Sequence, residues 1–152
     1  MKEIERKWLL KDGVDIQKLI FCAAKSYEIS DHYFNPGTRL RIINNEEYQV
    51  TIKSMGFEER DELNLVIPKD VIGLFKNKKP CLEKTRYIIP YNNQQFELNV
   101  FKNVKIDNEH LILVELEVPS LDTCVDIPDW IGKEVTACPN YYGYKLYEML
   151  RA

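Results

Sequence analysis

The chain has 152 residues, of which 45% are apolar and 30% are charged, and its formal net charge is -3. These values favour a single domain over residues 1–152, with the composition of an ordinary soluble protein. The acidic balance argues against a nucleic-acid partner, because such proteins carry a basic footprint. We also expect no membrane partner, since the sequence has no run of about 18 apolar residues that could span a bilayer.

The cysteines do not follow the spacing of a metal site. Cys22, Cys81, Cys124 and Cys138 include no Cys-x-x-Cys pair, and the chain has only two histidines. A zinc site is therefore not expected. The N-terminus is charged from Lys2 onward, which is not typical of a secretory signal. Free thiols in a cytoplasmic protein are the simpler expectation.

Alternation of apolar and polar residues dominates the chain, with turn residues between the alternating stretches. The predicted strands are residues 2–10, 25–34, 38–43, 48–54, 60–65, 82–89, 95–101 and 110–118. The predicted helices are residues 14–22, 71–75 and 141–150, and a short extended piece is expected at 134–136. About eight strands, mostly joined as hairpins, indicate a mainly β (α+β) fold built as an antiparallel barrel or sandwich.

The first strand carries charged residues at every second position. Because successive side chains of a strand point to opposite faces, Glu3, Glu5 and Lys7 share one face. Two carboxylates at this spacing can hold a hard divalent cation, and a neighbouring lysine suits a phosphate. Taken alone, the pattern also fits a solvated face, because Glu and Lys are common on protein surfaces.

The later strands repeat this charged face. Their bases lie in the middle of the chain, and the paired acids lie near its two ends. The full set consists of Glu3, Glu5, Lys7, Arg39, Arg41, Lys53, Glu62, Lys84, Arg86, Glu97, Glu115 and Glu117.

Two interpretations fit this charged face. The first is a half-exposed sheet whose charges face water. The second is a closed barrel whose charged face points inward, since eight strands leave room for side chains or one small ligand. Unpaired charges inside a barrel would cost several kcal/mol each, so they must pair with one another, a metal or a charged ligand. Bases beside carboxylates fit a polyanion bridged by a divalent metal.

Short motifs stand in a fixed order along nearly the whole chain. They are Glu3-Ile4-Glu5-Arg6-Lys7, Arg39-Leu40-Arg41, Thr51-Ile52-Lys53, Glu83-Lys84-Thr85-Arg86, Glu115-Leu116-Glu117 and Trp130-Ile131-Gly132-Lys133-Glu134-Val135-Thr136. The ordered set resembles the CYTH superfamily, the triphosphate tunnel metalloenzymes, and is far more specific than any one motif. The resemblance implies a closed eight-stranded antiparallel β-barrel with a charged tunnel, a few short covering helices, and Mg²⁺- or Mn²⁺-dependent chemistry on triphosphate compounds.

The resemblance also implies a role for each residue of the charged face. The implied substrate-binding residues are Lys7, Arg39, Arg41, Lys53, Lys84 and Arg86. The implied metal ligands are Glu3, Glu5, Glu62, Glu115, Glu117 and Asn99. The implied catalytic residues are Glu115, Glu117 and Glu97.

Some positions depart from the family pattern. Many members carry an acidic residue where Asn64 stands and an aspartate where Asn99 stands. An asparagine can ligate through its carbonyl oxygen but lacks the charge, so the Asn99 departure bears on hydrolytic rate more than on ligand binding. Glu97 lies on the same face and is the candidate substitute. Asn140 and Gly143 replace residues frequent in the family, where the last helix is expected to close the tunnel mouth.

Three functions follow from this pattern. The first is a metal-dependent phosphohydrolase that acts on inorganic triphosphate through direct attack by water. The second is a class IV-like adenylate cyclase acting on ATP, although the sequence identifies no adenine pocket; a thiamine triphosphatase is a further variant. The third is a triphosphate- or polyphosphate-binding module with low turnover.

The apolar outward faces are expected to be covered by the short helices or by a second subunit in a homodimer.

Overall fold

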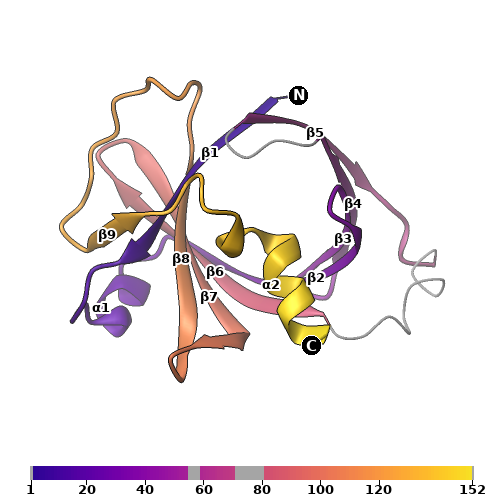
Figure 1. Cartoon of the computed structure of the whole chain (residues 1–152), viewed down its shortest axis with the longest axis horizontal. Helices are drawn as coiled ribbons and strands as arrows, with labels where there is room; N and C mark the ends of the chain where they lie inside the picture. The colour runs from indigo at the N-terminus through magenta and orange to yellow at the C-terminus, as the bar shows by residue number, and fades with distance from the viewer. Residues whose placement is uncertain (1, 55–58, 71–80, 152) are drawn as a thin grey trace.

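The computed structural model of the chain describes residues 2–54, 59–70 and 81–151. Within these ranges nine strands form one antiparallel sheet in the order β5-β4-β3-β2-β6-β7-β8-β1-β9 (Figure 1). The strands are β1 (Lys2–Leu10), β2 (Lys25–Asn35), β3 (Thr38–Ile43), β4 (Glu47–Lys53), β5 (Glu59–Val66), β6 (Leu82–Tyr91), β7 (Gln94–Ile106), β8 (Glu109–Glu117) and β9 (Ile131–Glu134). The helices are α1 (Ile16–Phe21), α2 (Gly143–Arg151) and the short 3-10 helix η2 (Pro139–Tyr141). None of the described helices is long and apolar enough to cross a membrane.

Hairpin turns built from Asn and Asp join neighbouring strands. The pairs 44–45, 92–93 and 107–108 all have positive φ values, between 49° and 66°. Asn and Asp tolerate this left-handed region better than other residues with a side chain, and two such residues in a row match the twist of a tight hairpin. These turns connect β3 to β4, β6 to β7 and β7 to β8, and so fix which residues face each other.

The N-terminal strand β1 pairs with three other strands. Residues 5–8 pair with β8, and Trp8 and Leu10 pair with β9. The first residues of β1 pair with β5, with Glu3 opposite Arg60. Figure 1 shows the strands curving round so that the N-terminal end of β1 lies beside β5. Strands β5 and β8, which lie at the two ends of the series β5-β4-β3-β2-β6-β7-β8, therefore both pair with β1.

The prediction of a mainly β, antiparallel fold is confirmed, with changes at particular elements. Strand β7 extends to residue 106, beyond the predicted 95–101, because its end pairs with the start of β8. Strand β9 lies at residues 131–134 instead of 134–136, since it pairs with β1. The helix expected at 71–75 lies outside the described residues.

One apolar cluster packs on the face of the sheet opposite to the charged residues. Phe96 and Leu98 of β7 are fully buried there, and Glu97 between them points to the other face. Helix α1 and strand β9 complete this cluster with Leu19 and Ile131. Full burial of such a side chain contributes about 1.5–3 kcal/mol, so this cluster fixes which face of each strand carries the charges.

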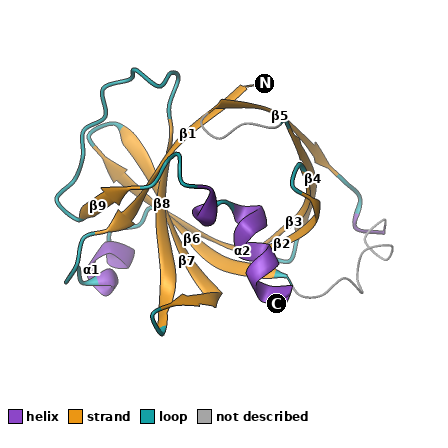
Figure 2. Cartoon of the chain, viewed as in Figure 1, coloured by secondary structure: helices purple, strands orange, loops and turns teal. Residues whose placement is uncertain are grey.

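A second apolar cluster lies on the charged face, toward one end of the strands. Leu82 and Leu113 lie two residues before the charged positions of β6 and β8, and Phe101 lies four residues after Glu97 of β7, all on the same face. Helix α2 contacts β2, β6 and β7 and packs Leu146 and Tyr147 into this cluster (Figure 2). The charged part of the face is thereby bounded by a helix at one end.

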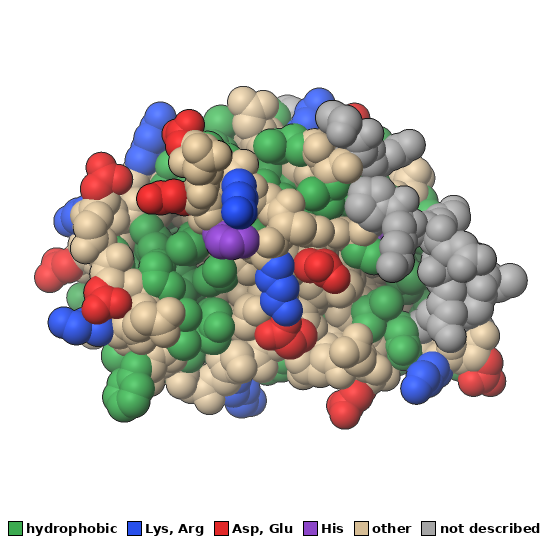
Figure 3. All heavy atoms as spheres, turned by 90° about the horizontal axis from the view of Figure 1, so that it is seen from below, with side chains coloured by type: hydrophobic (Ala, Val, Ile, Leu, Met, Phe, Trp, Pro, Cys, Tyr) green, Lys and Arg blue, Asp and Glu red, His purple; other side chains and the backbone are tan. Residues whose placement is uncertain are grey.

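Figure 3 shows one face of the molecule, on which apolar side chains lie between scattered acidic and basic side chains. The dense grouping of bases and acids expected from the sequence is not on this face. It lies on the other side of the strands.

Candidate functional site

The charged face lines a cavity of about 520 Å³. The predicted site residues that line it are Glu5, Lys7, Arg39, Arg41, Lys53, Glu62, Lys84, Arg86, Glu97, Glu115 and Glu117. The remaining predicted residues are Asn99 and Glu3. Asn99 is fully buried behind it, and the side chain of Glu3 lies outside the part of the chain that the structure describes. The structure therefore brings together side chains from β1 and from β3 to β8.

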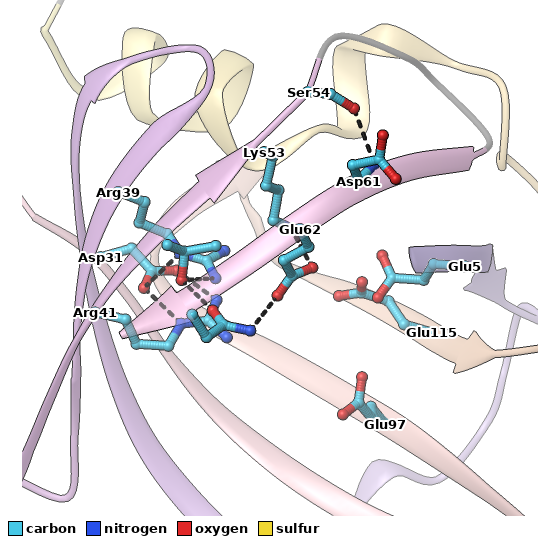
Figure 4. Close-up of polar contacts among 12 residues, drawn as sticks. Glu5, Asp31, Arg39, Arg41, Lys53, Ser54, Asp61, Glu62, Glu97 and Glu115 are labelled. Atoms are coloured by element: carbon cyan, nitrogen blue, oxygen red, sulfur yellow. Dashed lines mark hydrogen bonds and ion pairs between the residues drawn. The ribbon is translucent and has the colours of Figure 1, made fainter. Parts of the chain in front are cut away.

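Three carboxylates converge at one side of the cavity. Glu5, Glu97 and Glu115 each place an oxygen within 4.8 Å of the other two (Figure 4). The register explains the grouping, because Glu97 stands directly opposite Glu115 between β7 and β8, and Glu5 stands opposite Glu117 between β1 and β8. Carboxylates at such distances repel one another unless cations separate them. An all-oxygen, anionic donor set of this kind suits a hard divalent cation.

The ammonium of Lys7 partly offsets this repulsion. Its Nζ lies 3.7 Å from an oxygen of Glu5 and 4.0 Å from an oxygen of Glu115. Burial disfavours ionisation of Glu115, but Lys7, a hydrogen bond with Glu5 and the nearby Lys84 and Arg86 hold its pKa well below the ordinary value. Glu115 is therefore ionised at neutral pH and can bind a cation without first losing a proton.

Asn99 bridges the two kinds of charge. Its Oδ1 accepts a hydrogen bond of 2.9 Å from Nε of Arg86, and its Nδ2 donates one of 2.9 Å to Oε1 of Glu115. Metal ligation by the Asn99 carbonyl oxygen, the role implied by the family, would compete with Arg86 for that oxygen.

Asp31 is a site residue that sequence reasoning missed. It is 1% exposed and forms a two-pronged ion pair with Arg41, at 2.8 and 2.9 Å, while Nε of Arg39 lies 3.9 Å away. Its burial raises the pKa, but Arg41 and Arg39 outweigh this effect and hold the pKa of Asp31 well below its ordinary value. The only sequence signal was an acid in the strand before the Arg-x-Arg motif, a strand that also contains Glu28. Its partnership with Arg41 comes from the register of β2 and β3.

A hydrogen-bonded chain runs from Arg39 across β4 to β5. Nη2 of Arg39 donates to Thr51 at 3.1 Å, Thr51 donates to Asn64 at 2.6 Å, and Asn64 donates to Glu62 at 2.6 Å. Glu62 in turn lies 3.8 Å from Nζ of Lys53. Nε of Arg39 is buried and has no hydrogen-bond partner among the described residues. A buried donor without a partner costs about 1–3 kcal/mol, so this N–H favours an anion in the cavity.

Lys84 lies deeper than Arg86, the other base of β6. It is 6% exposed, and its Nζ stands 5.4 Å from the centre of the Phe101 ring. Burial, together with the positive charges of Arg86 and Arg41, lowers the pKa of Lys84 to about 7. A polyanion in the cavity would favour the charged form of Lys84.

Tyrosines line the end of the cavity near α2. Tyr33 packs against Tyr144 and Tyr147 of this helix, with ring centres 5.8 and 5.6 Å apart. A Cβ atom at Gly143 would lie 2.1 Å from the Tyr33 hydroxyl oxygen, so no side chain fits there unless Tyr33 moves. The family departure at Gly143 thus lets the Tyr33 hydroxyl lie against the start of the last helix.

We expect Asp31→Asn to lower the free energy of unfolding by about 3–5 kcal/mol at neutral pH, because it leaves buried arginines without their counter-charge. Since the pKa of Asp31 is depressed in the folded state, its contribution is present above the ordinary value of 3.8 and is lost as the pH falls below it. Urea unfolding at neutral and acidic pH measures both effects. Glu28→Gln provides the control. Glu28 pairs with Lys102 at an exposed position, so its loss should lower the free energy of unfolding by only about 0–1 kcal/mol. A deficit of Asp31→Asn that persists undiminished in acid would contradict this account.

We expect triphosphate binding to draw a proton onto Lys84 at a pH somewhat above 7. Calorimetry in chelator, in two buffers of different ionisation enthalpy, gives the number of protons taken up. The parent should take up more protons than Lys84→Met. Triphosphate itself gains or loses the same number of protons in both proteins, so this contribution cancels in the difference. Equal uptake by both proteins would show that the Lys84 charge does not change on binding.

Comparison with known proteins gives the site its family context. The CYTH domain family matches residues 1–142. An inorganic triphosphatase from Acetivibrio thermocellus is 31% identical over 154 residues, which cover 95% of this chain and 92% of the relative. A crystal structure of the inorganic triphosphatase NE1496 is 29% identical, with a TM-score of 0.63, and the alignment covers 95% of this chain and 93% of that one. A structure of the hypothetical protein NE1496 aligns with a TM-score of 0.61 at the same identity, over 95% of this chain and 96% of that one. The chain belongs to the CYTH family.

Proposed function

We propose that this protein hydrolyses inorganic triphosphate, using Mg²⁺ or Mn²⁺, in a tunnel inside a closed eight-stranded barrel. The observation that carries the proposal is a single cavity in which clustered carboxylates face a group of buried bases. The relatives described as inorganic triphosphatases support this choice of substrate.

The pairing of β1 supports closure of the barrel. This strand pairs with β8 through residues 5–8 and with β5 through residues 2–4, at the two ends of the same run of strands. An eight-stranded barrel holds side chains or one small ligand, which agrees with a cavity of about 520 Å³.

Residues 1–152 are proposed to form one domain in the cytoplasm. The homodimer remains a prediction, and exposed Ile52 and Leu63 on the outward face of β4 and β5 support it.

The bases of the cavity are proposed to bind and orient the triphosphate chain. They are Lys7, Arg39, Arg41, Lys53, Lys84 and Arg86. Arg39 offers a buried N–H that no described group accepts, whereas Arg41 is already fixed by Asp31. Arg41 therefore contributes mainly positive potential, and Arg39 contributes a donor whose hydrogen bond is made only when an anion is present.

Glu5, Glu97 and Glu115 are proposed to hold the divalent cation, with Glu3, Glu62, Glu117 and Asn99 as the further ligands that the family implies. The fit rests on their shared space and on the low pKa of Glu115. A bound Mg²⁺ or Mn²⁺ would neutralise phosphate charge and acidify a water molecule.

The lining favours attack by water over a covalent intermediate. Among the described residues that line the cavity there is no cysteine or histidine, and Ser54 accepts a hydrogen bond from the backbone N–H of Asp61. The candidate catalytic carboxylates are Glu97, Glu115 and Glu117. Of these, Glu97 is half-buried with an oxygen 3.3 Å from Nη1 of Arg86, a contact that positions its carboxylate, and it is our candidate general base.

Phosphate release tests the proposal. Inorganic triphosphate, ATP and pyrophosphate are each incubated with the protein in Mg²⁺, in Mn²⁺ and in chelator. We expect metal-dependent release from triphosphate, well above that from ATP. Formation of cyclic AMP would instead identify a cyclase. Tight triphosphate binding without release would identify a binding module with low turnover.

Arg39→Ala should weaken triphosphate binding about tenfold or more, because charge-assisted hydrogen bonds are lost. Lys102→Ala is the matched control, since this base on β7 is about half exposed and pairs with Glu28 away from the cavity. Calorimetry in chelator compares the two variants with the parent. If Arg39→Ala binds as well as Lys102→Ala, the assignment of the cavity as the triphosphate site is wrong.

A further inference from the structure

The contacts of Asn99 in this structure point to another role than the metal ligation that the family implies. It is fully buried in β7, directly opposite Arg86 of β6 and Leu113 of β8. Besides its 2.9 Å contacts with Arg86 and Glu115, its Nδ2 lies 3.3 Å from the carbonyl oxygens of Leu113 and Glu97. These backbone contacts hold the amide in place, so its orientation is fixed by the sheet.

The amide is chemically matched to both of its charged neighbours. Nε–H of Arg86 can only donate, and the ionised carboxylate of Glu115 can only accept. An asparagine meets both demands with one side chain. An aspartate of the same size would accept from Arg86 but would place a second carboxylate against Glu115. A leucine would meet neither demand.

The two neighbours belong to the two halves of the site. Arg86 also lies 3.3 Å from Glu97 through Nη1 and 3.9 Å from Glu115 through Nη2. Without Asn99, nothing described here would hold Nε of Arg86, and the guanidinium could turn fully onto the carboxylates. The same loss would release Glu115 from its fixed position beside Glu5 and Glu97.

We propose that Asn99 is a positioning residue that holds Arg86 ready for phosphate and Glu115 ready for the cation at the same time. This inference rests on the proposed function, because it takes the cavity as the site of triphosphate and metal. It assigns Asn99 a role that acts through its two neighbours, in place of direct ligation of the metal.

Two equilibrium measurements test the inference without relying on hydrolysis. In Asn99→Leu, triphosphate binding in chelator reports on Arg86, and Mn²⁺ binding without triphosphate reports on Glu115. We expect each affinity to fall about tenfold, as for loss of a hydrogen bond to a charged group. Asn103→Leu is the control on the same strand, since Asn103 of β7 accepts from the backbone N–H of Glu83 and donates to the backbone carbonyl of Cys81, outside the cavity. Both affinities should be unchanged in this control.

A double-mutant cycle separates positioning from general distortion. In the Arg86→Ala background, Asn99→Leu should change triphosphate affinity by less than about twofold, because its effect passes through Arg86. An undiminished loss in that background would overturn the inference, as would unchanged affinities for triphosphate and Mn²⁺ in a folded Asn99→Leu.

Asn99→Asp keeps the size of the side chain and serves if the leucine variant does not fold. We expect its Mn²⁺ affinity not to rise and its turnover to fall. A gain in either would show that position 99 acts as a metal ligand and would overturn the positioning role. If the parent released no phosphate, the proposed function would be contradicted but the role of Asn99 would not. The affinities for triphosphate and Mn²⁺ would still test that role.

Discussion

The pairing of opposite charges inside one cavity is the constraint on which the rest of this structure depends. Each buried charge would cost several kcal/mol alone, so the cavity is stable only as a network. Lys7 stands between two glutamates, and Asp31 fixes Arg41. The N–H of Arg39 has no hydrogen-bond partner among the described residues, and Glu5, Glu97 and Glu115 crowd together within 4.8 Å. These are the places where an anion and a cation would complete the network, which links the stability of the fold to its ligands.

The apolar residues of the strands decide where this network forms. Side chains such as Phe96 and Leu98 are buried on the face covered by α1 and β9, so the residues between them must face the cavity. At one end the charged face itself becomes apolar, and α2 covers it with Leu146. Helix α2 therefore bounds the charged space without contributing to the acidic cluster.

Local sequence predicted the strands and their charged face because both depend on a period of two along a single strand. The same reasoning could not find the role of Asp31, because its pairing with Arg41 depends on the register between β2 and β3. It also misplaced β9, whose position follows from pairing with β1. A four-residue strand has too few alternating positions to be recognised from its own sequence. The motif order supplied what alternation could not, namely which strands share one site.

The two asparagines illustrate how a departure from a family pattern changes meaning once partners are known. In the sequence, Asn64 and Asn99 stand where many family members carry an acidic residue, so each position lacks a negative charge. In the structure, Asn64 accepts from Thr51 and donates to Glu62, while Asn99 accepts from Arg86 and donates to Glu115. An amide can both accept and donate at these positions while the neighbouring glutamates stay ionised, whereas an ionised aspartate could only accept. Each asparagine therefore removes one repelling charge from the cavity and adds a bond that orients a carboxylate. Fewer carboxylates leave less repulsion to overcome before a cation binds, but they also attract that cation less strongly.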